Sequence, residues 1–323
     1  MHSVARELPE HEHAFTPYYC EGLLEWAHRL GLGEFTVAGE KLVRRCLDYL
    51  AGERLTVDHR GRRGPYDLVV TCSDLVLQSS ARRARLVLLQ EGILDPEGWE
   101  FRLWRRLPFL PRWIAGTAAT GLSLAYDRFC VASEGYRDHF EGRGVPREKI
   151  AVTGIPNFDD CRRFLRNSFP HRGFVLVCTS DARETLKRDD RRAFLRRCRE
   201  IAAGRPLVFK LHPNENPERA TREIRAVAPE AAVFATGSAE EMIASCDALV
   251  TQYSSTAFVG LALGKETHSY WDIGELRRLL PVQNGCAARN VAEVCREVLA
   301  EGPVRQQERP ALAGLALPEA EAP

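Results

Sequence analysis

Residues 246–265 read CDALVTQYSSTAFVGLALGK, and this stretch decides the class of fold. A short apolar run at 248–251 is followed by a polar turn and then by an apolar segment with helical spacing. The turn carries consecutive hydroxyl side chains at Ser254, Ser255 and Thr256. A strand, a polar turn and a helix in this order are typical of a β-α unit in a parallel sheet.

The same alternation of short apolar runs with longer helical patterns extends along the chain, which predicts an α/β fold. In the first half we expect strands at 14–19, 34–37, 67–71, 86–90, 129–132 and 150–153, and helices at 22–31 and 40–50. In the second half we expect strands at 174–179, 207–211, 232–235, 248–251 and 267–270, and helices at 190–203, 217–227, 239–245, 255–263 and 290–300. A length of 323 residues then favours two Rossmann-like domains that face a cleft.

A break at 154–160, where glycine, proline and asparagine interrupt the periodicity, separates the two halves. We therefore predict a first domain at 1–160, a second domain at 161–302 and a disordered tail at 303–323. A doubly wound domain normally opens with a strand and a glycine-rich turn, but this chain opens with what resembles the end of a helix. Either the sequence begins after that strand or the first domain lacks it, and both alternatives stay open.

Charge and cysteine content exclude several classes of protein. The 45 basic and 44 acidic residues nearly cancel, which argues against a nucleic-acid partner. The sequence has no apolar run of about 18 residues and no basic-then-apolar start, so we expect a cytoplasmic protein. The 10 cysteines are scattered, with no Cys-x-x-Cys pair, which favours reduced buried thiols over a metal site or a disulfide framework.

The hydroxyl turn is a candidate anion site. A helix that starts at Ser254, Ser255 and Thr256 offers free backbone N–H groups and the positive end of its dipole to a phosphate. The alternative is ordinary capping of the helix by these side chains. Because the turn follows a strand of a parallel sheet, we predict phosphate binding here.

A second candidate follows the strand at 207–211. Lys210 and His212 are two residues apart, so an extended strand would present them on one face, and Pro213 ends the strand. Both side chains can contact a phosphate. The alternative is a histidine packed under a loop and a lysine in solvent, and the neighbouring hydroxyl turn favours the phosphate site.

A third candidate is a carboxylate in the first half. Glu91 and Gly92 directly follow the expected strand at 86–90, where a general base would face the cleft. Equally, Glu91 could cap the next segment. The loop after the strand at 174–179 supplies weaker candidates for ligand contact, namely Thr179, Ser180 and Arg183.

Aromatic and basic residues are interleaved at 99–114, which includes three of the five tryptophans. This composition suits a peripheral contact with lipid headgroups or with a lipid-linked acceptor. The alternative, which we favour, is a lid helix whose aromatic side chains pack into the first domain. Two prolines in the segment argue against a long amphipathic helix.

Taken together, these motifs resemble the GT-B superfamily over about residues 60 to 300. The similar families are the CDP-glycerol glycerophosphotransferases and the bacterial sialyl- or polysialyltransferases, and more distantly the non-hydrolysing UDP-N-acetylglucosamine 2-epimerases. The sialyltransferase pattern has an acidic pair before glycine as general base, and a His-Pro and a Ser-Ser that contact the donor phosphate. Here Glu91-Gly92, His212-Pro213 and Ser254-Ser255 match it.

The chain departs from these patterns at two places. Gln90 replaces the first acid of the pair, which leaves Glu91 as the candidate base. The epimerases carry His-Arg-x-Glu-Asn after the first strand of their second domain and Asp-Ser-Gly-Gly in their anion turn. This chain reads DARET at 181–185 and QYSS at 252–255, which argues against epimerisation.

The resemblance implies a transferase that moves a sugar or polyol-phosphate group from a nucleotide-activated donor to a hydroxyl of a glycan or lipid-linked acceptor, in cell-surface glycan synthesis. The first domain would be the acceptor side, and the second would bind the donor phosphate through Lys210, His212, Ser254, Ser255 and Thr256. We expect no cofactor and no metal, because the chain has no Asp-x-Asp motif. An epimerase-like enzyme and a non-catalytic nucleotide-sugar-binding protein remain as alternatives.

Overall fold

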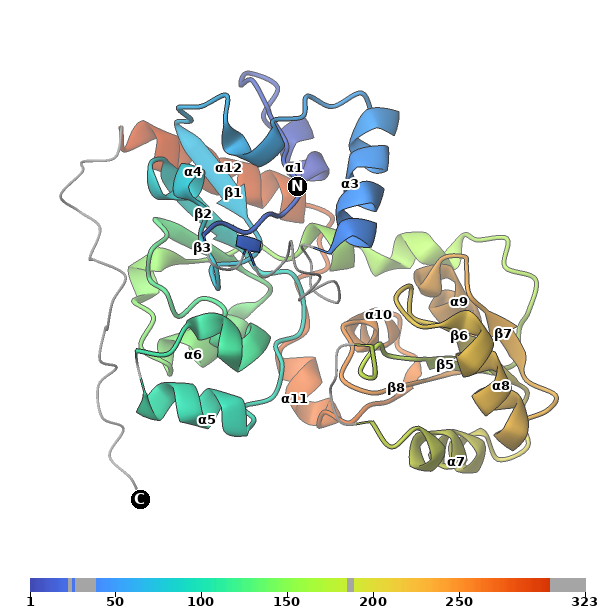
Figure 1. Cartoon of the computed structure of the whole chain (residues 1–323). Coiled ribbons are helices and arrows are strands. Elements are labelled where there is room, and N and C mark those ends of the chain that lie inside the picture. The colour runs from blue at the N-terminus through green and yellow to red at the C-terminus, as the bar shows by residue number, and fades with distance from the viewer. Residues whose placement is uncertain (23–24, 27–38, 108, 185–188, 303–323) are drawn as a thin grey trace. The chain divides into compact units, whose positions relative to one another are not determined.

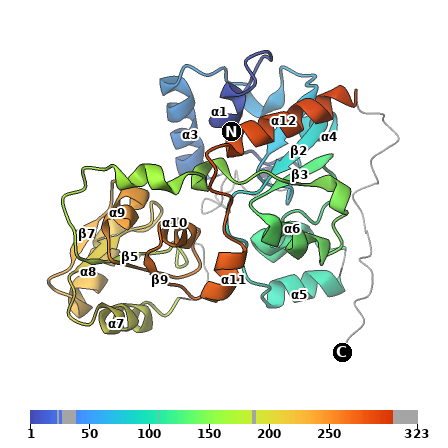
Figure 2. The same cartoon turned by 180° about the vertical axis from the view of Figure 1, so that it is seen from behind.

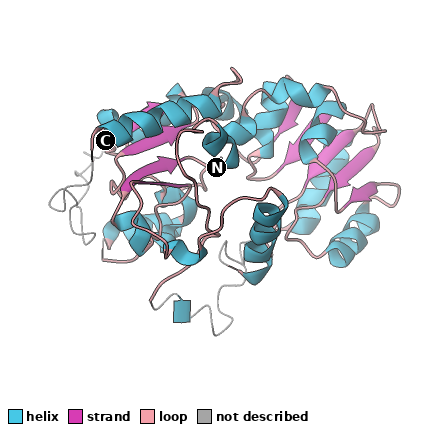
Figure 3. Ribbon diagram, turned by 90° about the horizontal axis from the view of Figure 1, so that it is seen from above, coloured by secondary structure: helices cyan, strands magenta, loops and turns pink. Residues whose placement is uncertain are grey.

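The protein is represented by a computed structural model that describes residues 1–22, 25–26, 39–107, 109–184 and 189–302. The described residues divide into two compact units, one within 1–156 and 286–302 and the other within 157–285 (Figure 1). Each unit contains a parallel sheet flanked by helices (Figure 3). The expected α/β class with two Rossmann-like units is therefore confirmed.

The second unit contains a five-stranded sheet in the order β7-β6-β5-β8-β9, with every neighbouring pair parallel. Its strands are β5 Val175–Cys178, β6 Leu207–Lys210, β7 Ala232–Phe234, β8 Ala248–Thr251 and β9 Glu266–His268. All five lie where the apolar runs predicted strands.

Helices cover both faces of this sheet. Side chains alternate along β5, so Val175 and Val177 pack with α7 Arg191–Ala202 and α8 Pro217–Val227, whereas Leu176 and Cys178 pack with α9 Ala239–Ser245 and α10 Thr256–Ala262. The short helix α11 Ile273–Arg278 packs on α10. Side-chain caps fix the starts of α8 and α9: Asn216 accepts from the N–H of Arg219, and Ser238 accepts from the N–H of Glu241.

The first unit contains four parallel strands in the consecutive order β1-β2-β3-β4. They are β1 Leu68–Thr71, β2 Arg85–Leu89, β3 Arg128–Val131 and β4 Ile150–Val152. The strand expected at 14–19 is reduced to a single bridge between Phe15 and Val57. The expected strand at 34–37 and most of the expected helix at 22–31 lie outside the described residues, as does the tail at 303–323.

One helix lies in a different unit from the one expected. The sequence-based division counted residues 286–302 with the second domain, whereas α12 Ala287–Ala300 belongs to the first unit. Its apolar face, with Val291 and Val298, packs against Val87 of β2 and against α1 His2–Arg6, which lies beside it (Figure 2). The periodicity of a helix predicts that it has an apolar face, but not which sheet that face will cover.

The other face of the first unit's sheet is covered by a different helix. Cys130 of β3 points towards α12, while the ring of its neighbour Phe129 packs edge-to-face on Phe140 of α6 Glu134–Glu141 with ring centroids 4.6 Å apart, so α6 covers the opposite face. The other elements of the first unit are α3 Glu40–Gly52, α4 Ser79–Arg82, α5 Trp99–Arg106 and the 3-10 turns η1 His59–Gly61, η2 Arg112–Ala119 and η3 Arg147–Lys149. The 3-10 turn η4 Pro156–Phe158 spans the boundary between the units, and η5 Cys161–Leu165 belongs to the second unit, where it packs on α9. In the described part of the chain, no helix combines the length and the apolar character needed to span a membrane.

Candidate functional site

The strand order of the second unit creates a place for a ligand. From β5 the chain continues through β6 to β7 on one side, and then returns to place β8 and β9 on the other side. The loops after β5 and β8 therefore leave towards opposite faces of the sheet. In open parallel sheets, ligands bind at the carboxyl ends of the two strands where the order reverses.

Polar side chains from three loops meet at this edge. The hydroxyl of Ser180, after β5, donates to Oε1 of Gln252, after β8, at 2.6 Å. On the other side, the amide of Asn214, after β6, donates to Oδ2 of Asp181 at 2.9 Å. Ser180 and Asp181 are adjacent, so one hydrogen-bonded chain connects the carboxyl ends of β5, β6 and β8.

His212 belongs to this chain of polar groups, and its side chain is 37% exposed. The backbone N–H of Asn214 donates to Nδ1 of the ring at 3.2 Å. Because Nδ1 accepts this hydrogen bond, the proton of the neutral ring is on Nε2. A further Nδ1 contact, 3.5 Å from Oδ2 of Asp181, would hold the protonated ring. In either state Nε2 can donate a hydrogen bond to an anion.

A buried ion pair supports the loop that carries His212. Arg191 of α7 and Glu215 are 6% and 3% exposed, and their side chains bond at 2.8 Å. The other carboxylate oxygen of Glu215 accepts from the backbone N–H of His212 at 3.0 Å and from the hydroxyl of Thr179. Glu215 thus fixes the backbone at His212 to the end of β5.

The hydroxyl turn begins α10 as predicted. The Ser254 and Thr256 hydroxyls are 2.9 Å apart, and Ser254 Oγ also accepts from the backbone N–H of Thr256 at 3.3 Å. Ser255 occupies the N-cap position without a side-chain cap bond. All three side chains are partly exposed. Ser254 thus caps the backbone, and the turn presents hydroxyls next to Gln252.

Lys210 and Arg183 are engaged by groups of the second unit itself. Lys210 is only 7% exposed, and its ammonium donates to the carbonyls of Leu211 and Ala235 at 2.9 and 3.4 Å. Its burial lowers the pKa of the ammonium. Arg183 donates to Glu223 of α8 at 2.6 Å, and this bond raises the pKa of its guanidinium. Lys210 therefore bonds to backbone carbonyls, while His212 bonds to Asn214 and Asp181.

The candidate base lies at the carboxyl edge of the first unit. Gln90 is fully buried; its amide nitrogen donates to the carbonyl of Gly92 at 2.9 Å, and its oxygen accepts from the N–H of Ala132 at 2.9 Å. Gln90 thus anchors the turn that carries Glu91 to the end of β3. The Glu91 side chain is exposed, yet partial loss of water around its carboxyl group raises its pKa.

Several residues of this site were not singled out from the sequence: Asp181, Asn214, Gln252, Arg191 and Glu215. Gln252 directly follows the expected strand at 248–251 and lies two residues before Ser254, so its place after a strand was a usable signal. Arg191 and Glu215 pair across 24 residues, and nothing local in the sequence marks them as partners. Among the described residues, no group of three or more histidine, cysteine or acidic side chains is arranged to hold a metal ion.

Comparisons with known proteins agree with this architecture at the level of the fold. No protein-family model matches the chain, and no curated protein matches it in sequence. A putative UDP-N-acetylglucosamine 2-epimerase from Listeria monocytogenes aligns with TM-score 0.51 and 14% identity over 92% of this chain and 82% of that one. A UDP-GlcNAc 2-epimerase from Neisseria meningitidis, solved with UDP-GlcNAc bound, aligns with TM-score 0.51 and 11% identity over 86% and 82%.

A structure of the wall teichoic acid polymerase TagF aligns more weakly, with TM-score 0.47 and 10% identity over 76% of this chain and 77% of that one. At these identities, the similarity to the two epimerase structures extends to the fold alone. The chain therefore shares its fold, two parallel α/β units with the order of strands reversing in the second, with the two epimerase structures.

Proposed function

We propose that the chain transfers a sugar or polyol-phosphate group from a nucleotide-activated donor to a hydroxyl acceptor. The observation that carries the proposal is the hydrogen-bonded polar chain at the reversal of strand order in the second unit, which includes Ser180, His212 and Gln252. The Neisseria meningitidis structure is described with UDP-GlcNAc bound, so the fold accommodates a nucleotide sugar.

In this proposal the second unit holds the donor phosphate. Nε2 of His212 and the hydroxyls of Ser254, Ser255 and Thr256 would donate to phosphate oxygens, and these bonds would strengthen as charge develops on the leaving nucleotide. Thr179 and Arg183 would hold the loops in place through Glu215 and Glu223. Lys210 would supply positive charge from within the unit, because its ammonium is held by carbonyls.

Glu91 is the proposed general base that takes the proton from the acceptor hydroxyl. A carboxylate with a raised pKa is a better match for a general base near neutral pH than one with an ordinary pKa. Gly92 supports this geometry through its carbonyl, which accepts from Gln90. The reaction would need no metal, so we expect a chelator to leave turnover unchanged.

The donor site can be tested by replacing its hydroxyls. We expect Ser254→Ala with Ser255→Ala to weaken nucleotide binding by about 1 to 3 kcal/mol, because hydrogen bonds to charged groups are lost. CMP, CDP and UDP would be titrated by thermal shift, since a ligand of the folded state raises its melting temperature. Ser168→Ala, an exposed serine of the same unit, is the control. Unchanged nucleotide affinity in the double variant would remove this turn from the donor site.

The reaction products distinguish transfer from two other candidate functions, epimerisation and binding without turnover. The similarity to two epimerase structures favours epimerisation as a second candidate, and Gln90 in place of an acid favours a binding protein without turnover. With UDP-, CDP- and CMP-linked donors, a transferase releases nucleotide in the presence of acceptor. An epimerase would convert UDP-GlcNAc without releasing nucleotide, and a binding protein would do neither.

The segment 99–114 indicates where the acceptor would come from. Phe101 and Trp104 pack inside the first unit, whereas Trp99 and Phe109 are 69% and 79% exposed. Arg102, Arg105 and Arg106 are also exposed. We extend the proposal to an acceptor at a membrane surface, which the exposed aromatic rings and arginines would contact.

Sedimentation with vesicles tests this extension. The chain should sediment with vesicles of phosphatidylglycerol and phosphatidylcholine at low salt and dissociate from them as the salt concentration rises. Trp99→Ala with Phe109→Ala should abolish sedimentation without unfolding, whereas Trp104→Ala would confound the result because Trp104 is in the core. Failure to sediment at low salt would assign the chain a soluble acceptor.

A further inference from the structure

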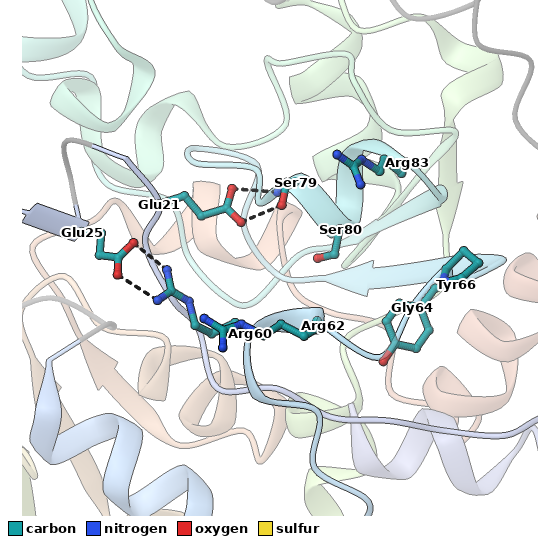
Figure 4. Close-up of a pocket in the computed structure, with 11 residues that line it drawn as sticks. Glu21, Glu25, Arg60, Arg62, Gly64, Tyr66, Ser79, Ser80 and Arg83 are labelled. Carbon is teal, nitrogen blue, oxygen red and sulfur yellow. Dashed lines mark hydrogen bonds and ion pairs between the residues drawn. The ribbon is translucent and has the colours of Figure 1, made fainter.

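The first unit contains a polar pocket of about 720 Å³ that the proposed function does not use. It lies between the start of α4, with Ser79 and Ser80, and the loop that carries Arg60 and Arg62. Figure 4 shows Arg83 on the α4 side, the two loop arginines opposite it and Tyr66 at one end. The volume is within the range of small-molecule sites, which is about 300 to 1,000 Å³.

The pocket is separate from Glu91. Tyr66 lies just before β1 and Arg83 just before β2, so the pocket is at the amino end of these parallel strands. Glu91 follows the carboxyl end of β2, which has 5 residues. At about 3.3 Å per residue, roughly 15 Å separates the two ends. A ligand in this pocket would therefore be distinct from an acceptor hydroxyl at Glu91.

Two of the pocket's donor groups are occupied by carboxylates of the chain. Glu25 binds both terminal nitrogens of Arg60, at 2.8 and 2.7 Å. Glu21 accepts from the backbone N–H and the hydroxyl of Ser79, at 2.9 and 2.8 Å. These pairs neutralise Arg60 and satisfy the first N–H of α4, so neither is available to an anion without displacing a carboxylate.

The guanidinium groups of Arg62 and Arg83 are different. Both residues are exposed and line the pocket, and neither side chain has an ion pair or hydrogen bond with any residue in the described part of the chain. Two unpaired guanidinium groups beside one cavity create a local positive charge. Guanidinium groups bind phosphate oxygens through paired N–H bonds, which suits them to this anion.

The loop that carries Arg62 is fixed in place. Asp58 is 3% exposed, and its carboxylate accepts from the backbone N–H groups of Arg62 and Arg63, each at 2.9 Å, and from the hydroxyl of Tyr66. Gly61 has φ of +61°, and a Cβ there would lie 2.8 Å from Cβ of Ser80. The loop therefore approaches α4 as closely as a glycine allows. Its backbone bonds to Asp58 and this close approach fix the shape of the pocket wall.

We propose that this pocket binds the phosphate group of a phosphorylated sugar or polyol, through Arg62 and Arg83. Oxygens of Glu21 and Glu25, which also line the cavity, would accept hydrogen bonds from the hydroxyls of the ligand. The proposal does not depend on the donor site in the second unit. A variant can therefore lose binding at one of the two sites and retain binding at the other.

Residue-resolved protection from phenylglyoxal tests the pocket in the intact chain. The reagent modifies accessible arginines, and mass spectrometry measures the rate at each one. Glycerol 3-phosphate should slow modification of Arg62 and Arg83 several-fold and leave Arg63 and Arg82 unchanged. The latter pair are exposed sequence neighbours that do not line the pocket, so they are matched internal controls. Equal rates with and without the probe, or equal slowing of all four arginines, would overturn the proposal.

Variants and a second probe complete the test. Arg83→Ala should weaken the protection of Arg62 at least about tenfold, whereas Arg82→Ala should retain it. Ser254→Ala with Ser255→Ala should also retain it, which separates this site from the nucleotide site. Vesicles containing phosphatidylglycerol identify the source: protection by glycerol 3-phosphate alone indicates a free phosphorylated ligand, and protection by both indicates that a lipid headgroup can also enter. Retained protection of Arg62 in Arg83→Ala would contradict the proposal.

Discussion

The two parallel sheets of this chain differ in how their strands are ordered. In the second unit the order β7-β6-β5-β8-β9 reverses between β5 and β8, whereas the described strands of the first unit follow one another as β1-β2-β3-β4. The reversal sends neighbouring loops to opposite faces, so their polar side chains meet at one edge. Ser180 and Gln252, from the two sides of that reversal, are joined by a hydrogen bond.

The described strands of the first unit show no such reversal. Polar side chains at the carboxyl edge of that sheet form hydrogen bonds with the backbone of the first unit. Asp74 is fully buried and accepts from the N–H groups of Gly121 and Ser123 at 2.9 and 3.0 Å. Gln90 and Ser133 likewise bond to backbone groups. Glu91 is exposed at this edge. The comparison predicts that the second unit supplies binding groups and the first supplies a proton acceptor.

Glu91→Gln should produce the largest effect. The amide keeps the shape of the side chain but cannot take a proton, so turnover should fall by roughly two to four orders of magnitude while donor affinity is unchanged. Steady-state kinetics with nucleotide titration would measure both quantities.

Asp95→Asn is the matched control, because the Asp95 carboxylate already accepts from the hydroxyl of Thr117 at 2.9 Å. We expect it to change turnover far less than Glu91→Gln. If Asp95→Asn abolished turnover and Glu91→Gln did not, the general base would be Asp95 and the comparison of the two edges would have to be redrawn.

Breaking the buried ion pair should affect the second unit alone. Glu215→Ala leaves the buried Arg191 guanidinium with only its longer contact to Glu223, at 3.8 Å, and breaking a buried pair typically costs about 3 to 5 kcal/mol. Hydrogen exchange followed by mass spectrometry should show lost protection in β5 and β6, with β2 and β3 unchanged. Glu218→Ala, an exposed position on α8, is the control.

The paired replacement of Arg191 by Met and Glu215 by Leu should restore part of that stability, since no charge is then buried. It should not restore all of it, because Glu215 also accepts from the N–H of His212 and the hydroxyl of Thr179. Loss of protection spread equally over both units would mean that they unfold as one.

Local sequence signals predicted the elements of the second unit closely. Helices α8 Pro217–Val227 and α9 Ala239–Ser245 begin and end at the expected residues, and the side chains of Asn216 and Ser238 cap their starts. Apolar runs likewise located β5 to β9. These features depend on neighbours in the sequence, which a single chain displays.

Features that depend on distant partners could not be predicted in the same way. Lys210 has the residue type and position of a phosphate ligand, but its ammonium donates a hydrogen bond to the carbonyl of Ala235, 25 residues away. Arg183 is engaged by Glu223, 40 residues away. The spacing of α12 showed a helix, whereas its packing on β2 and α1 depends on the tertiary fold.

The smallest expected effect is on the free energy of unfolding. It is measured for one carboxylate in each unit, Glu91 in the first and Glu266 in the second. Loss of water raises the pKa of Glu91 in the folded state, so its charged form is disfavoured there. At pH below the ordinary carboxyl value, both the folded and the unfolded chain are protonated at this position, and Glu91→Gln should then leave the free energy of unfolding unchanged. As pH rises to 7, the unfolded chain ionises freely while the folded chain is penalised, so the glutamine variant should become the more stable one. Glu91 is exposed, so the gain should be under about 1 kcal/mol.

Glu266→Gln in the second unit should show the opposite sign. Hydrogen bonds from His268 and Arg205 lower the pKa of Glu266, so its charge stabilises the folded state above the ordinary carboxyl value, and that contribution is lost as pH falls through the lowered value. Glu266→Gln should therefore be less stable than the parent chain at pH 7 and equal to it in acid. Urea unfolding at pH 7 and in acid, followed by hydrogen exchange in each unit, measures both differences. A loss of stability at pH 7 in Glu91→Gln would show that Glu91 is held by partners like the other polar groups at its edge, and would remove the reason to regard it as the base.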